Sequence, residues 1–287
     1  IFIFFYFIFL APSNLTELLL NDNNTAVYSV YARNLIEYSL DKTFLLMSEI
    51  GPDGKNIFEK NDNTINRYIN HPPLLVWLTS ISYKLFGYEM IYGRMISIIS
   101  SSLFFLVFFR YLVYIKIKLF YILSTIIVLL SLPVYWTHGL IIEHQPLLNL
   151  FLLLTSINFL EYIFHNKQKN FSYFLFFWTL SFLTDWPAYL FLIPYTLIAI
   201  SNKNYKILPV LIGYPLAIYI SLNLYHQYSI NDLNLSAVLG IDLFYSRTTI
   251  NLFPDENFFD IWGTSIFKMS YLFVHFNFKL IISIMFL

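Results

Sequence analysis

Five polar side chains stand out in this sequence because their types and positions suit chemistry. Asp22 precedes a predicted helix start, and His71 opens a second predicted helix. Glu143 and His144 lie together in a turn between two apolar runs, and Asp185 lies in a later turn of the same kind. A carboxylate that stays ionised can accept a proton, and a histidine at the N-terminus of a helix can bind phosphate. These residue types therefore suit proton transfer and the binding of an anionic group.

Each of these residues also has an ordinary structural alternative. Asp22 could simply cap the helix that follows it, although the positive end of that helix would keep the carboxylate ionised. Glu143 and His144 could be interfacial side chains that reach for water, and His71 could be a polar cap at the membrane surface. Asp185 could lie at a hydrated loop tip. A carboxylate at membrane depth is costly unless it is paired or wet, which favours functional roles for Glu143 and Asp185.

The elements that must position these residues are those of a membrane protein. Hydrophobic residues make up 58% of the 287 residues and charged residues 12%, with a mean hydropathy of +0.63. Soluble domains carry about 25% charged residues, so lipid must solvate many of these side chains. There is no cysteine, which excludes disulfides and thiolate metal sites. No basic stretch suggests nucleic acid as a partner.

Apolar runs that approach membrane-spanning length recur along the chain. They cover residues 95–114, 119–136, 146–164, 171–184, 187–201, 207–225 and 271–287. We expect residues 1–287 to form one transmembrane domain that is truncated at both ends, because apolar runs touch both ends of the sequence. Within it we expect a first external loop with juxtamembrane helices (13–94), six transmembrane segments (95–225), and an external loop with a last span (226–287).

The segment HPPLLVWLTSISYKLFG, residues 71–87, predicts a helix that lies flat in the interface. Two prolines suit its first turn, Gly87 suits its end, and the helix is short for a membrane span. With this helix flat, the turn at 115–118 and every second turn after it hold the lysines of the spanning region. The alternate turns, 137–145 and 184–187, hold neither lysine nor arginine. The positive-inside rule then places the lysine-rich turns in the cytoplasm and the five side chains outside.

Four segments, in this order, resemble the GT-C glycosyltransferases that use polyprenyl-phosphate sugars. NDNNTAVYSVYARN resembles the family's loop acid followed by an A-x-Y-x-x-x-ARN helix, and RYINHPPL followed by LFGYEMIYGR resembles its Y-x-x-HPPL…LFG…R signature. EHQPLLNLFLLL matches the acidic residue of the second external loop. SFLTDWPAYLFL matches a broken hairpin that often reads LTKGP, with Asp185 where many relatives have lysine. The relatives include protein O-mannosyltransferases, which use dolichyl-phosphate-mannose, and the aminoarabinose transferase of lipid A.

The resemblance implies an all-α, polytopic membrane fold and a reaction. We expect about eight transmembrane or partial spans, with external amphipathic helices over an outward-facing cavity. An acceptor hydroxyl on a protein, lipid or glycan attacks the sugar through an oxocarbenium-like transition state, and the lipid phosphate leaves. Asp22 is the expected base. Glu143 either orients the acceptor or binds a divalent cation together with Asp22. That cation is the single candidate cofactor.

The remaining expected site residues would bind the sugar or its phosphate. They are His71, Arg94, His144, Asp185 and Tyr68. Arg94 lies near the start of a span, where its guanidinium could reach a lipid phosphate or merely anchor the helix at the interface. We expect the plasma membrane of a prokaryote, with the endoplasmic reticulum as the alternative. Two rival functions stay open: a transporter or flippase of lipid-linked sugars, for which the sequence shows no inverted repeat, and a non-catalytic, truncated relative.

Overall fold

The computed structural model describes five stretches of the chain, residues 23–38, 43–48, 67–68, 71–131 and 139–229. The chain divides into two units, residues 1–232 and 233–287, and every described residue belongs to the first. Asp22 and the expected apolar segments at 1–12 and 271–287 lie outside the described residues.

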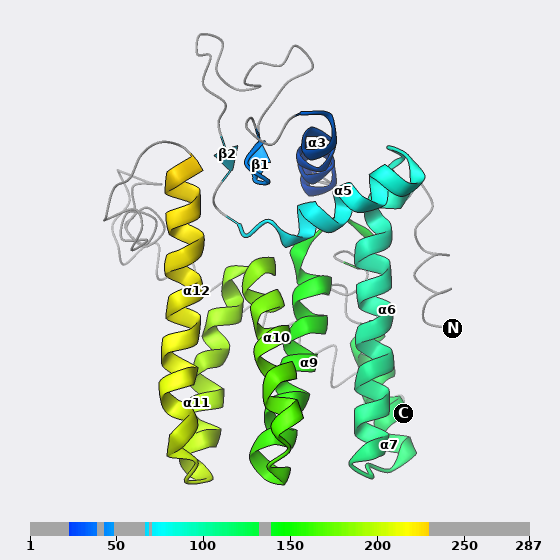
Figure 1. Ribbon diagram of the computed structural model, residues 1–287. Coiled ribbons are helices and arrows are strands. Elements are labelled where there is room, and N and C mark those ends of the chain that lie inside the picture. The colour runs from blue at the N-terminus through cyan, green and yellow to red at the C-terminus, as the bar shows by residue number, and fades with distance from the viewer. Residues whose placement is uncertain (1–22, 39–42, 49–66, 69–70, 132–138, 230–287) are drawn as a thin grey trace, which may run out of the picture. The chain divides into compact units, whose positions relative to one another are not determined.

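Two helices and a small sheet lie above the ends of the long helices in Figure 1. Helix α3 (Asn23–Glu37) packs on helix α5 (Leu74–Phe86), and strand β1 (Met47–Ser48) pairs antiparallel with β2 (Arg67–Tyr68). Figure 1 shows α5 lying across the ends of α6 and α9, as expected for a helix in the interface. It ends at Gly87, whose φ of 102° suits a residue without a side chain.

The long helices run side by side beneath this layer (Figure 1). In chain order they are α6 (Met90–Tyr114), α7 (Leu119–Ser131), α9 (His144–His165), α10 (Gln168–Thr184), the 3₁₀ turn η1 (Trp186–Phe191) with α11 (Leu192–Ser201), and the 3₁₀ turn η2 (Tyr205–Ile207) with α12 (Leu208–Ser229). These elements follow the apolar runs of the sequence closely, including the break at Asp185.

The expected count of spans is only partly accounted for by the described residues. Three helices there are long and apolar enough to cross a membrane: Met90–Tyr114, His144–His165 and Tyr205–Ser229. Leu74–Phe86, Leu119–Leu130 and Trp186–Ser201 are apolar but shorter. The described residues are mostly helical, as predicted, but they do not confirm about eight spans.

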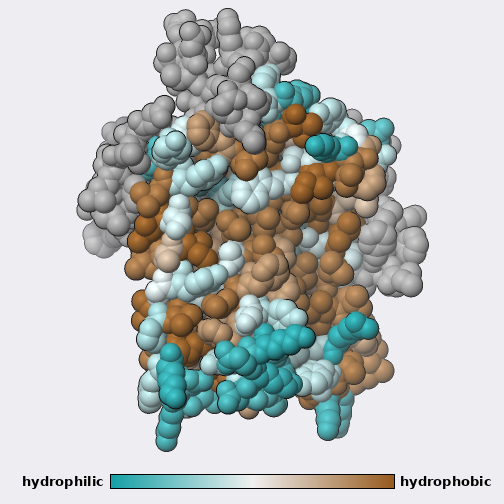
Figure 2. All heavy atoms as spheres, in the orientation of Figure 1, coloured by the Kyte–Doolittle hydropathy of each residue, from teal (hydrophilic) through white to brown (hydrophobic). Residues whose placement is uncertain are grey.

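The two ends of the long helices differ in charge. Figure 1 places the turns after α6, α9 and α11 at one end, and α3, α5 and the start of α9 at the other. The first end carries exposed lysines, and Figure 2 shows a hydrophilic rim there. They are Lys116, Lys118, Lys167, Lys169, Lys203 and Lys206. We call this end the lysine end and the opposite one the His71 end. The alternation predicted from the turns is thus present in the fold.

An aromatic core holds α9, α10, α11 and α12 together. Phe159, Phe174, Trp178 and Phe182 are fully buried, and their rings contact one another along α9 and α10. Apolar side chains gain little free energy when they move from lipid to a protein interior, so close packing of this kind must supply most of the attraction between helices. This core fixes the end of α10 and thereby the position of Asp185.

Candidate functional site

Four of the expected site residues meet at the His71 end, from three separate parts of the chain. His71 precedes α5, Glu143 and His144 begin α9, and Asp185 separates α10 from η1. Glu143 is 5% exposed, His144 1% and Asp185 6%. We call these four residues the His71 cluster. Polar side chains so well buried must be satisfied by one another or by a ligand.

His71 is held by Asp185. Its Nδ1 lies 3.0 Å from Oδ1 of Asp185, and the same oxygen accepts the backbone N–H of Trp186 at 2.8 Å. Asp185 thus caps η1 and binds the histidine ring with the same oxygen atom. An ionised carboxylate can only accept, so Nδ1 of His71 carries the hydrogen. The contact fixes both the tautomer and the orientation of the ring.

His144 lies between His71 and a tyrosine of α3. The rings of His71 and His144 stack with their centroids 4.8 Å apart and an angle of 21°, and Tyr28 meets His144 edge-on at 4.8 Å. Nε2 of His144 is buried and has no hydrogen-bond partner among the described residues. A buried nitrogen in that state costs free energy, which a bound acceptor or donor would recover.

Glu143 is fixed at the N-terminus of α9. Its Oε1 accepts the backbone N–H of His144 at 3.1 Å and lies 3.6 Å from Nδ1 of that residue. Its own N–H donates to Oγ of Ser97 on α6, at 3.4 Å. The positive end of the 22-residue helix α9 stabilises a carboxylate in this position. The structure therefore holds an oriented acid at the His71 end.

Helix α3 also contacts this region through two residues that the sequence did not single out. Oγ1 of Thr25 accepts the backbone N–H of Ile142 at 3.0 Å, and both residues are fully buried. Tyr28, three residues on, lies against His144. Positions three apart share one face of a helix, so the sequence does indicate that Thr25 and Tyr28 lie on the same face of α3. It carried no signal that this face meets Ile142 and His144.

Arg94 lies on the first turns of α6 and is 4% exposed. The hydroxyl of Tyr83 shares a 2.7 Å hydrogen bond with Ser29 of α3. Burial raises the pKa of Tyr83, and the Ser29 hydrogen bond and the charge of Arg94 partly offset that rise. Tyr83 therefore keeps a neutral hydroxyl at physiological pH, with Arg94 close enough to influence its pKa.

The other expected residues are less well placed by the structure. Tyr68 belongs to β2, where it pairs with Met47, and the position of its side chain is not described. Asp22 lies outside the described residues, so the expected metal site of Asp22 and Glu143 stays a prediction. Among the residues that the structure does describe, no group of three or more His, Asp or Glu side chains could hold a metal ion.

Comparison with known proteins gives one match. The model of the family "dolichyl-phosphate-mannose-protein mannosyltransferase" matches residues 70–226. That range includes all four residues of the His71 cluster and Arg94. No curated protein and no solved structure matches the chain.

Proposed function

The chain belongs to the dolichyl-phosphate-mannose-protein mannosyltransferase family, and on that premise we propose that it transfers a sugar from a polyprenyl-phosphate donor to an acceptor hydroxyl. Family membership implies a membrane glycosyltransferase that uses a lipid-linked sugar. Which residue is the base, which residues bind the phosphate and on which side of the membrane the site lies are proposals that rest on the geometry of the His71 end. A protein or glycan is the acceptor class that fits the family.

One hydrogen bond carries the assignment of the two carboxylates. Thr25, three residues after Asp22, accepts the N–H of Ile142, the residue before Glu143. This contact brings the start of α3 to the start of α9 and supports the convergence of Asp22 and Glu143 on one site. In our proposal Asp22 takes the proton of the acceptor hydroxyl, and Glu143 orients that hydroxyl.

The two histidines suit the leaving phosphate. His71 and His144 are stacked, and the buried Nε2 of His144 can donate to a phosphate oxygen in the tautomer that protonates it. Asp185 would repel a phosphate, so we assign it to holding His71 and not to binding the donor. Arg94 and Tyr68 complete the proposed phosphate and sugar ligands, because a guanidinium pairs well with phosphate.

The charge of the turns supports an extracytoplasmic site. The exposed lysines of the described long helices and their turns lie at the end opposite the His71 cluster, where Figure 2 shows a hydrophilic rim. Lysine-rich turns stay in the cytoplasm during membrane insertion. The donor's sugar phosphate would then lie at the outer surface with its polyprenyl chain in the bilayer.

Sugar release by the full-length protein in nanodiscs, measured over a panel of polyprenyl-phosphate sugars, tests the proposal. We expect turnover of one donor, and a loss of about 10²-fold or more in Asp22→Asn, because a missing general base typically costs that much. Glu37→Gln is the matched control: this acid of α3 is exposed and pairs with Arg33 at 3.5 Å, so turnover should change less than about twofold.

The outcomes separate the rival assignments. Turnover that survives Asp22→Asn but not Glu143→Gln would move the base to Glu143. A folded protein that binds a donor but turns over none in the panel would overturn the proposal and favour a transporter or a non-catalytic relative.

A further inference from the structure

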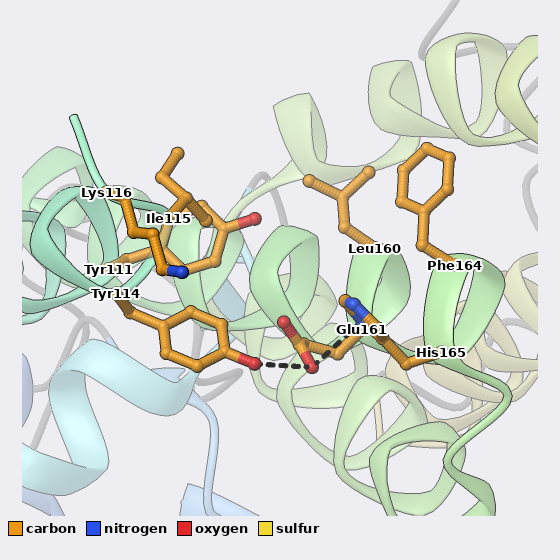
Figure 3. Close-up of a pocket in the computed structure, with 8 residues that line it drawn as sticks. All are labelled: Tyr111, Tyr114, Ile115, Lys116, Leu160, Glu161, Phe164 and His165. Carbon is orange, nitrogen blue, oxygen red and sulfur yellow. Dashed lines mark hydrogen bonds and ion pairs between the residues drawn. The ribbon is translucent and has the colours of Figure 1, made fainter.

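A cavity of about 520 Å³ opens at the lysine end, between the last turns of α6 and α9 (Figure 3). Its polar lining residues are Tyr111, Tyr114, Lys116, Glu161 and His165. It lies at the other end of α9 from the His71 cluster, so the proposed sugar transfer does not use it. Charged and polar side chains in a largely apolar lining, at the end of apolar helices, call for an explanation of their own.

Glu161 is the unusual member of this lining. It lies within a candidate membrane span and is 8% exposed. All its described contacts go to one oxygen, Oε2, which accepts from Nζ of Lys167 at 2.8 Å and from the hydroxyl of Tyr114 at 3.5 Å and lies 3.3 Å from Nδ1 of His165. Figure 3 shows the other carboxylate oxygen, Oε1, directed away from Tyr114 and His165, toward the side of the cavity where Tyr111 and Lys116 lie. The cavity therefore presents one carboxylate oxygen that no described residue engages.

Lys116 supplies a positive charge to the same cavity. It follows the end of α6 in the left-handed conformation, with φ of 62°, and it forms no ion pair with any described residue. Lys167 neutralises Glu161 from the side, and the hydrogen bond that Lys167 donates to Glu161 raises the pKa of Lys167, so this pair stays ionised at neutral pH. The cavity thus offers a carboxylate oxygen and a separate ammonium.

The backbone favours a cation near Glu161. Helices α6 and α9 both end at this cavity, and the C-terminus of a helix carries partial negative charge. A ligand with negative charge alone would meet two helix ends and a carboxylate. A ligand that carries both an ammonium and a phosphate would satisfy Glu161 and Lys116 together. Exposed apolar side chains, Ile115 and Phe164, border the cavity and could contact acyl chains.

We propose that this cavity binds the headgroup of an aminophospholipid of the phosphatidylethanolamine class from the leaflet at the lysine end. The primary ammonium donates to Oε1 of Glu161 beside Tyr111, the phosphate accepts from Lys116, and the acyl chains run over Ile115 and Phe164. The site belongs to the membrane domain itself and is separate from the transfer site. It would tie the ends of α6 and α9 together.

Native mass spectrometry of the delipidated full-length protein tests this directly. Phosphatidylethanolamine, phosphatidylcholine and phosphatidylglycerol with matched acyl chains are titrated in turn. We expect phosphatidylethanolamine to bind about tenfold more tightly than phosphatidylcholine, because a trimethylated ammonium cannot donate a hydrogen bond to Glu161. Equal binding of the two would overturn the proposal, and preferred binding of phosphatidylglycerol would identify an anionic-lipid site instead.

Two variants locate the binding. Lys116→Gln should weaken phosphatidylethanolamine binding about tenfold, as expected for the loss of a charge-assisted hydrogen bond. Lys203→Gln is its matched control, because Lys203 is exposed, lies at the same end and has a φ of 56°, but does not line the cavity. Glu161→Gln should abolish the preference over phosphatidylcholine. Equal effects of Lys116→Gln and Lys203→Gln would refute the site even if Glu161→Gln does not fold, and displacement of the lipid by inorganic phosphate would point to a free anion.

Discussion

His71 and Asp185 are 114 residues apart in the sequence and share a 3.0 Å hydrogen bond. Through it the segment that leads into α5 is tied to the turn between α10 and η1. The same Asp185 oxygen caps η1, so any movement of that turn must also move the His71 ring. The break between α10 and η1 therefore supplies the acceptor that orients the histidine of the candidate site.

Replacing Asp185 by asparagine should lower turnover without unfolding the protein. The amide oxygen can still accept the N–H of Trp186 and the hydrogen of His71, but the negative charge beside His71 is lost. We expect kcat/KM to fall about tenfold, in line with the loss of a charge-assisted hydrogen bond. Because the two residues act through one contact, His71→Ala combined with Asp185→Asn should cost little more than His71→Ala alone. Effects that multiply would show that Asp185 acts independently of His71.

Thr25 should matter for the site more than its position on α3 suggests. In Thr25→Val the backbone N–H of Ile142 loses its buried acceptor, which costs about 1–3 kcal/mol of stability. Turnover should fall as well, because Ile142 precedes Glu143. Thr125→Val is the control: Thr125 is exposed and, among the described residues, bonds to the carbonyl of Tyr121 in its own helix. Equal melting temperatures for the two variants would argue against the role given to Thr25.

The sequence predicted the elements of the fold well because their signals are local. Length, hydropathy and the polar break at Asp185 marked the long helices, and Pro72, Pro73 and Gly87 marked the limits of α5 within a few residues. The lysines placed the turns at alternating ends. Arg33 and Glu37 form an ion pair at 3.5 Å on α3, and their i, i+4 spacing favours such a pair on a helix.

The contacts of the site were less predictable because they join distant segments. Nothing local indicates that His71 stacks on His144 or that Thr25 meets Ile142. A helix that is apolar on all sides, such as α9, does not show which face turns inward. The sequence could therefore nominate Glu143, His144 and Asp185 one by one, but not show that they meet His71.

Gly93 should resist substitution because of its neighbours. A Cβ at this position of α6 would lie 2.5 Å from Cδ1 of Ile142 and 2.5 Å from the hydroxyl oxygen of Tyr83. Gly93→Ala should therefore destabilise the protein by about 1–3 kcal/mol and displace the residue before Glu143. Gly213→Ala, with no atom within 4 Å of the new Cβ, should be neutral or slightly stabilising. Thermal unfolding in detergent measures both, and a Gly93→Ala protein as stable as Gly213→Ala would mean that the contact with Ile142 is loose.

The absence of cysteine makes the orientation in the membrane directly measurable. Single cysteines at exposed positions, Tyr88→Cys between α5 and α6 and Lys203→Cys at the lysine end, can be labelled in intact cells with a membrane-impermeant maleimide. We expect labelling of Tyr88→Cys at once, and of Lys203→Cys only after the membrane is permeabilised, because lysine-rich turns remain in the cytoplasm. Lys118→Cys, in another turn of the lysine end, should behave like Lys203→Cys. The reverse pattern would place the His71 cluster in the cytoplasm, and the acceptor would then have to be a cytoplasmic molecule.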